Sequence, residues 1–408
     1  MITARGKLII ILFFTSLLFA YYTQWDIFYI SVAFFVLLLI TSFLFYKLVS
    51  VRLSYKRRLP AESYEGEKIE VKVSIENGSF IPWASLYISD YFGPEREGLR
   101  EKNIFFACLP YRQKFFWIYR GECYKRGEYI VGPLRIQVGD IFGVFERRIV
   151  LYYKDYLVVY PSLFEVNNFP IFIRGLTTRF GSQTMRRAGE YEEFAGIREY
   201  HLQDGLKKIH WRSTARLGKL IVKYFEYSAS YAVNIILDLK AGNDIGEGKD
   251  TTLEYQIKIA ASLARYLILR NIPTQIIGRG DRDYFSYLGD NEEHLHKILR
   301  MLAVMKAEGK MSLSEFLAFA DYLVSSNSTL VIFTLDREAQ SLSSLLEMVQ
   351  YKKNSVVRFV FDTESFYKKL SGDKFDYEPR ILSSDFISFN VKKNQKLSGF
   401  FKKSLVEI

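Results

Sequence analysis

The first fifty residues contain two long apolar runs, Leu8 to Tyr22 and Ile27 to Tyr46, neither of which includes a charged residue. A helix of about 20 residues is about 30 Å long, which matches the hydrocarbon core of a bilayer. No A-x-A cleavage motif follows the first run, and Tyr21, Tyr22 and Trp25 are typical of membrane interfaces. The pattern therefore predicts a transmembrane helical hairpin over residues 1–50 rather than a cleaved signal peptide.

Residues 51–165 show the alternation expected of β-strands. In KIEVKVSIENGSF, before a turn at Asn77-Gly78, apolar residues alternate with charged or polar ones at Ile69, Val71, Val73 and Ile75. The segments ASLYISDYF and QKFFWIYRGECY alternate in the same way, and glycine and proline separate the later segments. We expect an all-β, sandwich-like domain. Since no titratable cluster stands out in it, we interpret it as an interaction or spacer domain.

From Tyr231 onward, buried strands alternate with amphipathic helices. The segments YAVNIILDL, PTQIIGRG, STLVIFTLD and SVVRFVFD read as strands, and one helix is indicated by the stripe Leu253, Ile257, Ala260, Ala264 and Leu267. This alternation predicts a doubly wound, parallel α/β domain over residues 231–408. Ligands of such sheets bind at the carboxyl ends of the strands. Asp238 and Asp336, which each end a strand, would lie on that rim.

The distribution of positive charge predicts the membrane topology. Arg5 and Lys7 precede the hairpin, whereas the connecting TQWD carries one negative charge, and basic residues follow the hairpin at Lys47, Arg52, Lys56, Arg57 and Arg58. Positive residues stay on the cytoplasmic side. We therefore expect a two-pass protein of the inner (cytoplasmic) membrane, with both termini and the soluble domains in the cytoplasm.

The excess of basic residues indicates which classes of binding partner to expect. The chain has 56 Lys+Arg against 45 Asp+Glu, which suits an anionic membrane face, an acidic protein or nucleic acid. Membrane anchoring accounts for much of this excess, and no nucleic-acid-binding motif is present, so nucleic acid is not the expected partner. The two cysteines, Cys108 and Cys123, form no C-x-x-C pair and indicate neither a disulfide framework nor a zinc site.

Residues 166–230 contain a polar and aromatic segment, EFAGIREYHLQDGLKKIHWRSTARLGKLIVKYFE, that links the two predicted domains. In a structural interpretation, Trp211, Ile209 and Phe225 pack while Arg198, Asp204 and Arg216 form a network between the domains. In a docking interpretation, the basic side chains meet an acidic protein patch, at Lys207, Lys208, Arg212 and Lys219. In a catalytic interpretation, His201 and His210 act as acid and base, or the cations hold a phosphate. We take the first two together.

The hairpin, the segment KRGEYIVGPLRIQVGDIFGVF and this polar segment together resemble the bacterial domain-of-unknown-function 58 family over nearly the whole chain. The family signature runs approximately E-F-x-x-x-R-x-Y-x-x-G-D-D-x-R-x-I-x-W-x-x-x-A-R, followed by a strand. The matching residues are Glu193, Phe194, Arg198, Tyr200, Asp204, Ile209, Trp211, Ala215 and Arg216. The chain departs from the signature at Gln203, Gly205, Lys207 and His210.

This resemblance implies a C-terminal domain similar to a von Willebrand factor type A domain and a MoxR-type AAA+ ATPase as protein partner. It implies no reaction. Type A domains often hold Mg²⁺ through D-x-S-x-S at the end of the first strand, because Mg²⁺ needs hard oxygen ligands. The chain has Asp238, Lys240 and Gly242 at those positions, so both serine hydroxyls are missing. We therefore expect a degenerate site without a metal or other cofactor. The Lys240 ammonium either pairs with Asp238 or Asp336 or points into water.

Three other motifs carry little weight. GEGKDTT has Asp250 where a P-loop needs Ser or Thr, HLH places His294 and His296 on different faces of a helix, and RGD lies in the predicted cytoplasmic part. The sequence thus predicts a membrane-anchored, non-catalytic scaffold or adaptor working with a MoxR-type AAA+ ATPase or its client. The alternative is an enzyme or ligand-binding protein acting on a phosphorylated or cell-envelope substrate; the sequence identifies no small-molecule ligand.

Overall fold

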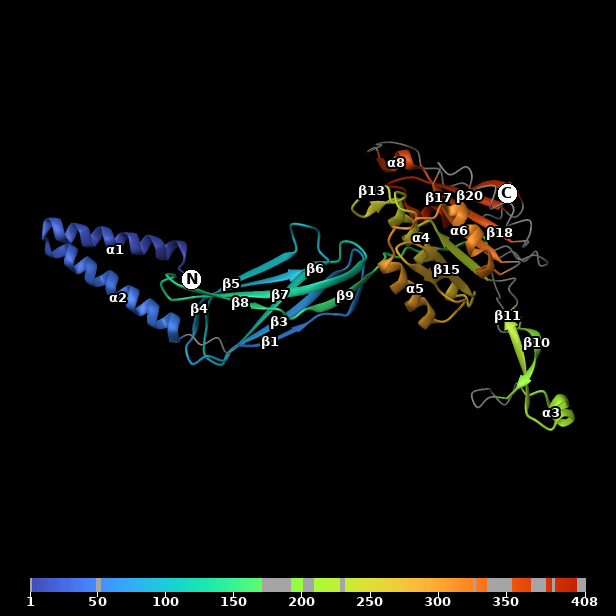
Figure 1. Cartoon of the computed structure of the whole chain (residues 1–408), viewed down its shortest axis with the longest axis horizontal. Coiled ribbons are helices and arrows are strands. Elements are labelled where there is room, and N and C mark those ends of the chain that lie inside the picture. The colour runs from blue at the N-terminus through green and yellow to red at the C-terminus, as the bar shows by residue number, and fades with distance from the viewer. Residues whose placement is uncertain are drawn as a thin grey trace. The chain divides into compact units, whose positions relative to one another are not determined.

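The computed structural model describes residues 2–48, 53–170, 192–200, 209–227, 232–325, 328–335, 354–367, 379–383 and 386–401. The chain forms two compact units, Met1–Tyr160 and Pro161–Ile408 (Figure 1). The first contains two helices and a β-sandwich, and the second contains an α/β sheet and a separate β-hairpin.

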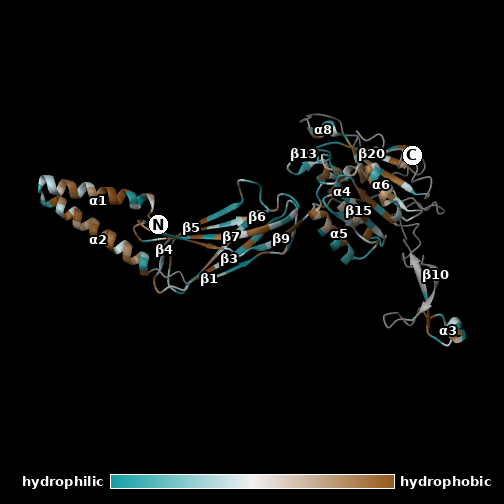
Figure 2. Ribbon diagram, in the orientation of Figure 1, coloured by the Kyte–Doolittle hydropathy of each residue, from teal (hydrophilic) through white to brown (hydrophobic). Residues whose placement is uncertain are grey.

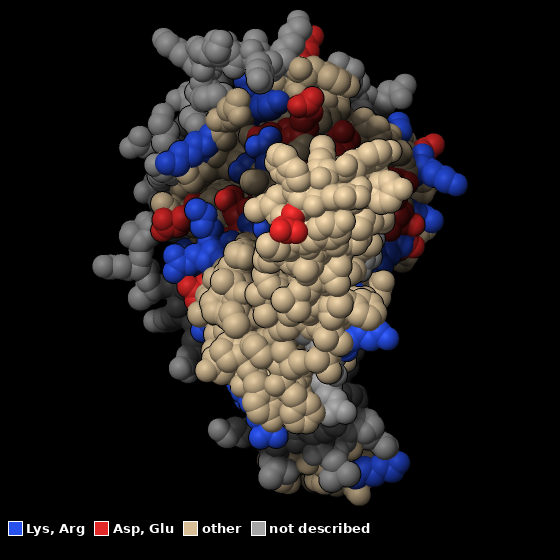
Figure 3. Space-filling view, turned by 90° about the vertical axis from the view of Figure 1, so that its left-hand side faces the viewer, with Lys and Arg blue, Asp and Glu red and all other residues tan. Residues whose placement is uncertain are grey.

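Two apolar helices open the first unit, α1 (Ala4–Thr23) and α2 (Asp26–Leu48), as the sequence predicts. Thr3 caps α1 by accepting a hydrogen bond from the Gly6 N–H at 2.9 Å. Gln24 ends the helix in the left-handed conformation, with φ of 55°. Both helices are long and apolar enough to cross a membrane, and their surface is almost free of charged side chains (Figures 2 and 3).

The β-sandwich consists of two sheets. One has the order β1 (Leu53–Arg58), β3 (Lys68–Asn77), β6 (Lys114–Glu122). The other has the order β2 (Glu62–Tyr64), β9 (Asp155–Tyr160), β7 (Gly127–Gly139), β4 (Trp83–Phe92), β5 (Glu101–Leu109), with β8 (Glu146–Leu151) also paired to β7. The alternation in the sequence is the cause of this arrangement, because the residues on one face of each strand form a shared core, including Val71, Val73, Ile75, Trp83, Leu86, Ile88 and Trp117.

The turn expected at Asn77-Gly78 is a crossing between sheets and not a tight hairpin. After β3 the chain enters β4, which belongs to the other sheet. The buried Asn77 side chain stabilises the crossing: its amide donates to the carbonyls of Ile81 (3.1 Å) and Leu109 (3.0 Å), and its Oδ1 accepts from Ser79. The amide side chain thus replaces the backbone bonds that a two-residue turn would supply.

The second unit contains a seven-stranded sheet in the order β16-β15-β12-β17-β18-β20-β19. Five neighbouring strands are parallel: β15 (Thr274–Arg279), β12 (Val233–Leu237), β17 (Thr329–Leu335), β18 (Ser355–Phe361) and β20 (Phe386–Val391). The edges, β16 (Asp283–Phe285) and β19 (Arg380–Ser383), are antiparallel. The chain passes from β12 to β15 and then returns to β17 on the other side of β12, which makes β12 the point where the strand order reverses.

Helices connect these strands. They are α4 (Thr252–Ile268), α5 (Glu292–Val304), α6 (Leu313–Ala320) and α8 (Thr363–Tyr367), with 3₁₀ turns at Asp321–Leu323 and Leu397–Phe401. The predicted stripe of α4 is buried from Leu253 to Leu267. α6 packs against sheet residues that include Ile236, Ile277 and Ile332. A short hairpin, β13 (Gly246–Glu247) and β14 (Asp250–Thr251), precedes α4.

The polar segment forms a second hairpin. β10 (Glu192–Glu199) and β11 (Ile221–Tyr227) pair antiparallel, and α3 (Trp211–Leu217) lies between them in the sequence. The Tyr200 N–H donates to the Leu220 carbonyl at 3.0 Å, which extends the pairing beyond the strands. The hairpin thus carries α3 on its connecting segment.

Candidate functional site

α3 is a seven-residue helix fixed at both ends. His210 is its N-cap: the ring Nδ1 accepts from the Ser213 N–H at 3.3 Å and lies 2.7 Å from the Ser213 Oγ. At the other end, Gly218 has φ of 65° and donates its N–H to the Thr214 carbonyl at 3.0 Å. The Thr214 Oγ1 also accepts from the Ile221 N–H at 3.1 Å, which connects the helix to β11. His210 therefore has a structural role in this region.

The side chains of α3 that take no part in these hydrogen bonds are exposed. Trp211 is 67% exposed, so the packing expected of it in the structural interpretation is wrong. Ile209 and Val222 instead form the buried contact, joined by a backbone bridge. Arg212 and Arg216 are exposed and lie four residues apart, on one face of the helix. α3 therefore presents an indole and two guanidinium groups to solvent.

The other residues of the predicted docking or inter-domain network are distributed differently. Tyr200 is half-buried beside β11, and Arg198 pairs with Val222 in the backbone register of the hairpin. Asp204, Lys207 and Lys208 lie outside the described residues, as does His201. The side chains of Arg198 and Phe225 also lie outside what the structure describes.

Asp238 follows β12 directly and is 3% exposed. Its Oδ1 accepts from the Lys240 backbone N–H at 3.2 Å, and its Oδ2 accepts from the Asn243 side-chain amide at 2.6 Å. A buried carboxylate is costly without such donors. Asp238 therefore holds the 238–243 loop in place. Asn243 was not identified from the sequence, because its contact with Asp238 depends on the conformation of the loop.

The loop after β12 also pairs with a distant segment. The Gly309 N–H donates to the Leu239 carbonyl at 2.8 Å, and the Ala241 N–H donates to the Gly309 carbonyl at 2.7 Å. A Cβ at Gly309 would lie 2.8 Å from the Leu239 carbonyl oxygen, closer than a side chain can approach. Gly242 has φ of 86°, a conformation that disfavours a serine at this position. The backbone of this loop is thus adapted to glycine.

The Lys240 ammonium lies near α6. At the N-terminus of α6, the Ser312 backbone N–H and hydroxyl donate hydrogen bonds to the Glu315 carboxylate and lower its pKa. The positive charge of Lys240 lowers this pKa further. Asp336 lies outside the described residues, so the pairing of Lys240 with Asp238 or Asp336 stays a prediction. In the part of the chain that the structure describes, no group of three or more His, Cys, Asp or Glu residues could hold a metal ion.

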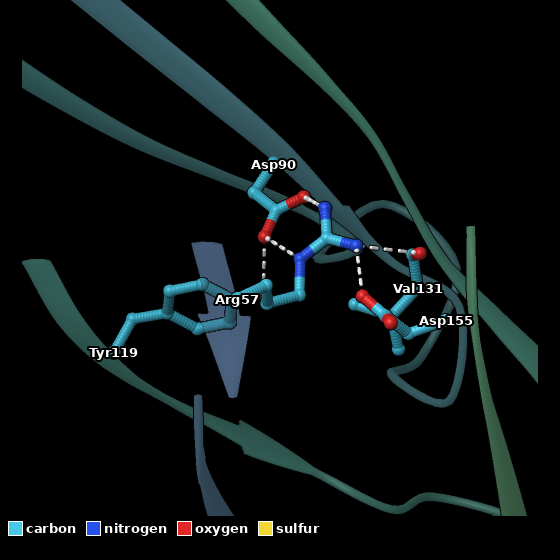
Figure 4. Close-up of polar contacts among 5 residues, drawn as sticks. All are labelled: Arg57, Asp90, Tyr119, Val131 and Asp155. Carbon is cyan, nitrogen blue, oxygen red and sulfur yellow. Dashed lines mark hydrogen bonds and ion pairs between the residues drawn. The ribbon is translucent and has the colours of Figure 1, made fainter. Parts of the chain in front are cut away.

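The β-sandwich contains a buried ionic cluster that the sequence analysis missed (Figure 4). The Arg57 guanidinium donates to Asp90 through Nη2 at 2.5 Å and Nε at 3.1 Å, and through Nη1 to Asp155 at 2.7 Å and to the Val131 carbonyl at 2.9 Å. The Tyr119 hydroxyl donates to Asp90 Oδ2 at 2.8 Å. The β-sandwich thus contains a titratable cluster, contrary to the prediction for residues 51–165.

The signal for this cluster is present in the alternation. Asp90 follows Leu86 and Ile88 on the inward face of β4, and Tyr119 follows Trp117 on the inward face of β6. A charged residue at an inward position needs a partner. Burial, together with the neighbouring Asp90 carboxylate, raises the pKa of Tyr119 well above its usual range, so this hydroxyl stays a donor.

Comparison with known proteins supports part of the resemblance. The chain is 21% identical over 323 residues to an uncharacterized protein, YeaD, of Bacillus subtilis (strain 168), covering 76% of this chain and 77% of the relative. Among solved structures, the CARDB domain of the PF1109 protein from Pyrococcus furiosus is similar over 26% of this chain and 91% of that domain, with 16% identity and a TM-score of 0.20. A PKD domain of an M14-like peptidase from Thermoplasmatales archaeon SCGC AB-540-F20 is similar over 26% of this chain and 91% of that domain, with 13% identity and a TM-score of 0.16.

TM-scores this low carry no argument about fold or function. A more informative match is to the model of a protein family, and the matched residues include α3 and β12. Residues 196–362 of this chain match the model of a family described as "Protein of unknown function DUF58".

Proposed function

We propose that this protein is a membrane-anchored, non-catalytic scaffold or adaptor that presents α3 to a cytoplasmic MoxR-type AAA+ ATPase or its client. The observation that carries the proposal is the exposure of Trp211 beside Arg212 and Arg216. Tryptophan and arginine dominate the binding energy of many protein interfaces. An exposed indole next to two guanidinium groups suits a partner with an acidic, partly apolar patch.

The anchor in this proposal is the α1–α2 hairpin in the inner membrane. The charge pattern supports an orientation with both ends in the cytoplasm: Arg5 and Lys7 lie at the start of α1 and Lys47 lies at the end of α2, whereas Asp26 lies at the connection. In this orientation the β-sandwich and the second unit lie in the cytoplasm, where an AAA+ ATPase would be available.

The α/β sheet serves in this proposal as a degenerate type A-like domain. Two features support this view. β12, the first parallel strand, is the point where the strand order reverses, and Asp238 follows it directly. The Asp238 oxygens receive the Lys240 N–H and the Asn243 amide, which are donors and therefore compete with a cation for the carboxylate. His210, the described histidine of the catalytic interpretation, caps α3.

The test is a crosslinked pull-down of the full-length protein from its native membranes, read by quantitative mass spectrometry. Wild type is compared with Trp211→Ala/Arg212→Glu, which changes the exposed face of α3. Arg265→Glu, at an exposed position of α4, is the control for a change of charge. We expect an AAA+ ATPase to be enriched with wild type and the control but not with the α3 variant.

Two results would contradict the proposal in different ways. If the ATPase is captured equally by the α3 variant, the partner is right but the docking surface is wrong. If no AAA+ ATPase is enriched with wild type, the partner itself is wrong.

A further inference from the structure

Three loops of the first unit lie at the end of the β-sandwich that adjoins α2. In the strand registers, Leu53 is opposite Asn77 and Trp83 is opposite Leu109, while Gly139 is opposite Ala84. The loops that follow these positions, residues 78–82, 110–113 and 140–145, therefore share one end of the sandwich. Only residues 49–52 separate Leu48, the last residue of α2, from Leu53, so this end lies within about 17 Å of the helix end.

The 140–145 loop contacts both apolar helices. The Thr3 N–H, at the start of α1, donates to the Val144 carbonyl at 2.9 Å. The Phe145 ring lies 5.6 Å from the Tyr46 ring and 6.2 Å from the Phe43 ring, both near the end of α2. A Cβ at Gly6 would collide with the Val144 carbonyl oxygen, so the close approach depends on glycine. The loop therefore lies level with the last apolar turn of α2.

The tips of these loops expose large apolar side chains. Ile141 is 63% exposed and Phe142 is 44% exposed, next to the helix ends. On the neighbouring loops, Phe80 is 77% exposed and stacks on Tyr111 with 5.8 Å between ring centroids. The Arg112 guanidinium lies 5.0 Å from the Tyr111 ring. Aromatic rings combined with a long cationic side chain suit the boundary between acyl chains and headgroups.

We propose that the loop tips carrying Phe80, Tyr111, Ile141 and Phe142 enter the interfacial layer of the same bilayer that α1 and α2 cross. This inference rests on the membrane anchoring proposed above. The bilayer is the occupant because the loops continue the apolar surface of the helices at the level where the helices leave the membrane. The β-sandwich then contacts the membrane through these loop tips in addition to its contacts with the helices, which holds it in one orientation to the bilayer.

The experiment uses the full-length protein, with Cys108→Ser to remove the exposed thiol, reconstituted in phosphatidylcholine–phosphatidylglycerol vesicles. An environment-sensitive NBD probe is attached at Phe80→Cys or Phe142→Cys, and its quenching by lipids with a nitroxide near the headgroup is measured. Leu99→Cys is the matched control, because Leu99 is also an apolar loop residue, 58% exposed. It lies at the other end of β4, which has 10 residues and is about 30 Å long.

Leu37→Cys, in the middle of α2, tests the anchoring itself. Protection of the buried Cys123 from alkylation verifies that each variant is folded. We expect the probes at 80 and 142 to be quenched several-fold more strongly than the probe at 99. If the Leu37 probe is protected from aqueous quenchers by the membrane but the probe at 80 or 142 behaves like the one at 99, the inference is overturned while the anchor stands. If the Leu37 probe is also in water, the anchor fails and the inference fails with it.

Discussion

Arg57 and Asp90 form a two-bond ion pair that connects the two sheets of the β-sandwich. The pair joins β1 to β4 with Nη2–Oδ1 and Nε–Oδ2 distances of 2.5 and 3.1 Å, and the two side chains are 1% and 0% exposed. Each charge has lost its hydration, so each depends on the other. The pair therefore fixes how the two sheets are placed on each other.

Replacing Asp90 by asparagine should destabilise the first unit by about 3 kcal/mol, because it leaves a buried guanidinium with less charge compensation. Asp155, 41% exposed, also contacts Arg57 and limits the loss. The measurement is hydrogen exchange of the β4 and β6 amides in the full-length protein in detergent micelles, which reports the free energy of opening.

The control for this change is an exposed ion pair in the same sandwich. Arg120 and Glu70 lie 2.9 Å apart with side chains 74% and 45% exposed, and Arg120→Gln should cost less than about 1 kcal/mol. Equal protection in Asp90→Asn and Arg120→Gln would show that the buried cluster does not stabilise the contact between the sheets.

The two cysteines should differ sharply in reactivity. Cys108 is exposed, whereas Cys123 is buried, and burial raises the pKa of the Cys123 thiol to about 11. Because the thiolate is the reactive form, N-ethylmaleimide at neutral pH should label one cysteine per folded chain. Intact-mass spectrometry with and without urea measures this difference. Labelling of both cysteines at similar rates in the folded chain would contradict the buried position of Cys123.

The same pKa predicts a dependence of stability on pH. In the unfolded chain the thiol ionises near its ordinary pKa of about 8.5, but in the folded chain it stays protonated to about 11. The contribution of Cys123 is therefore fully present below about pH 8.5 and is lost as the pH rises toward 11. Cys123→Ala should remove this part of the alkaline loss, which thermal unfolding at a series of pH values measures.

The alternation of apolar and polar residues was sufficient to predict β3, β4, β12 and α4, because each buries one or both faces in a regular period. The partners of Asp90 could not be predicted in the same way. They come from β1 and β6 of the other sheet, which meet β4 only through packing in the folded domain. The position of Asp90 within its strand was readable, but the identity of its partners was not.

Trp211 shows a second limit of the sequence. An indole in a short amphipathic segment was expected to pack. In α3, however, the Ser213 hydroxyl contacts the His210 ring and the Thr214 hydroxyl accepts from the Ile221 N–H, while Trp211 is left in solvent. Which face of a seven-residue helix is buried depends on these local hydrogen bonds, and hydrophobicity alone does not determine it. The rim at Asp238 was located correctly from the end of a strand, but the role of Asn243 emerged only with the loop conformation.

The loop after β12 should not tolerate a side chain at Gly309. A Cβ there would lie 2.4 Å from the Arg279 carbonyl oxygen and 2.8 Å from that of Leu239. Gly309→Ala should therefore push the two segments apart and destabilise the second unit by about 1–3 kcal/mol. Hydrogen exchange of the amides of residues 309 and 241, which donate across this pairing, is the measurement. Gly66→Ala is a useful comparison, since its Cβ would meet no atom within 4 Å and its φ of 88° makes backbone strain its main cost.

Asn243→Asp tests whether the Asp238 carboxylate has kept any capacity for a cation. The substitution places a second carboxylate 2.6 Å from Asp238 Oδ2, in place of the amide that donates to it. Two such groups cannot both ionise freely, so one of them should have a raised pKa in the folded variant. Relative to wild type, the stability of the variant should therefore be greatest at about pH 4 and fall as the pH rises toward 7, the opposite of an ion-paired carboxylate.

Thermal unfolding of the full-length protein across this pH range, with and without Mg²⁺, separates the outcomes. Asn243→Ala is the matched control: it removes the same donor at a cost of about 1–3 kcal/mol but adds no charge, so its loss should not depend on pH in this way. If Mg²⁺ restores the stability of Asn243→Asp at neutral pH but not that of Asn243→Ala, the rim retains the geometry of a cation site and Asn243 is the residue that closes it. If Mg²⁺ has no effect on either variant, Asp238 has become a purely structural acceptor for the loop.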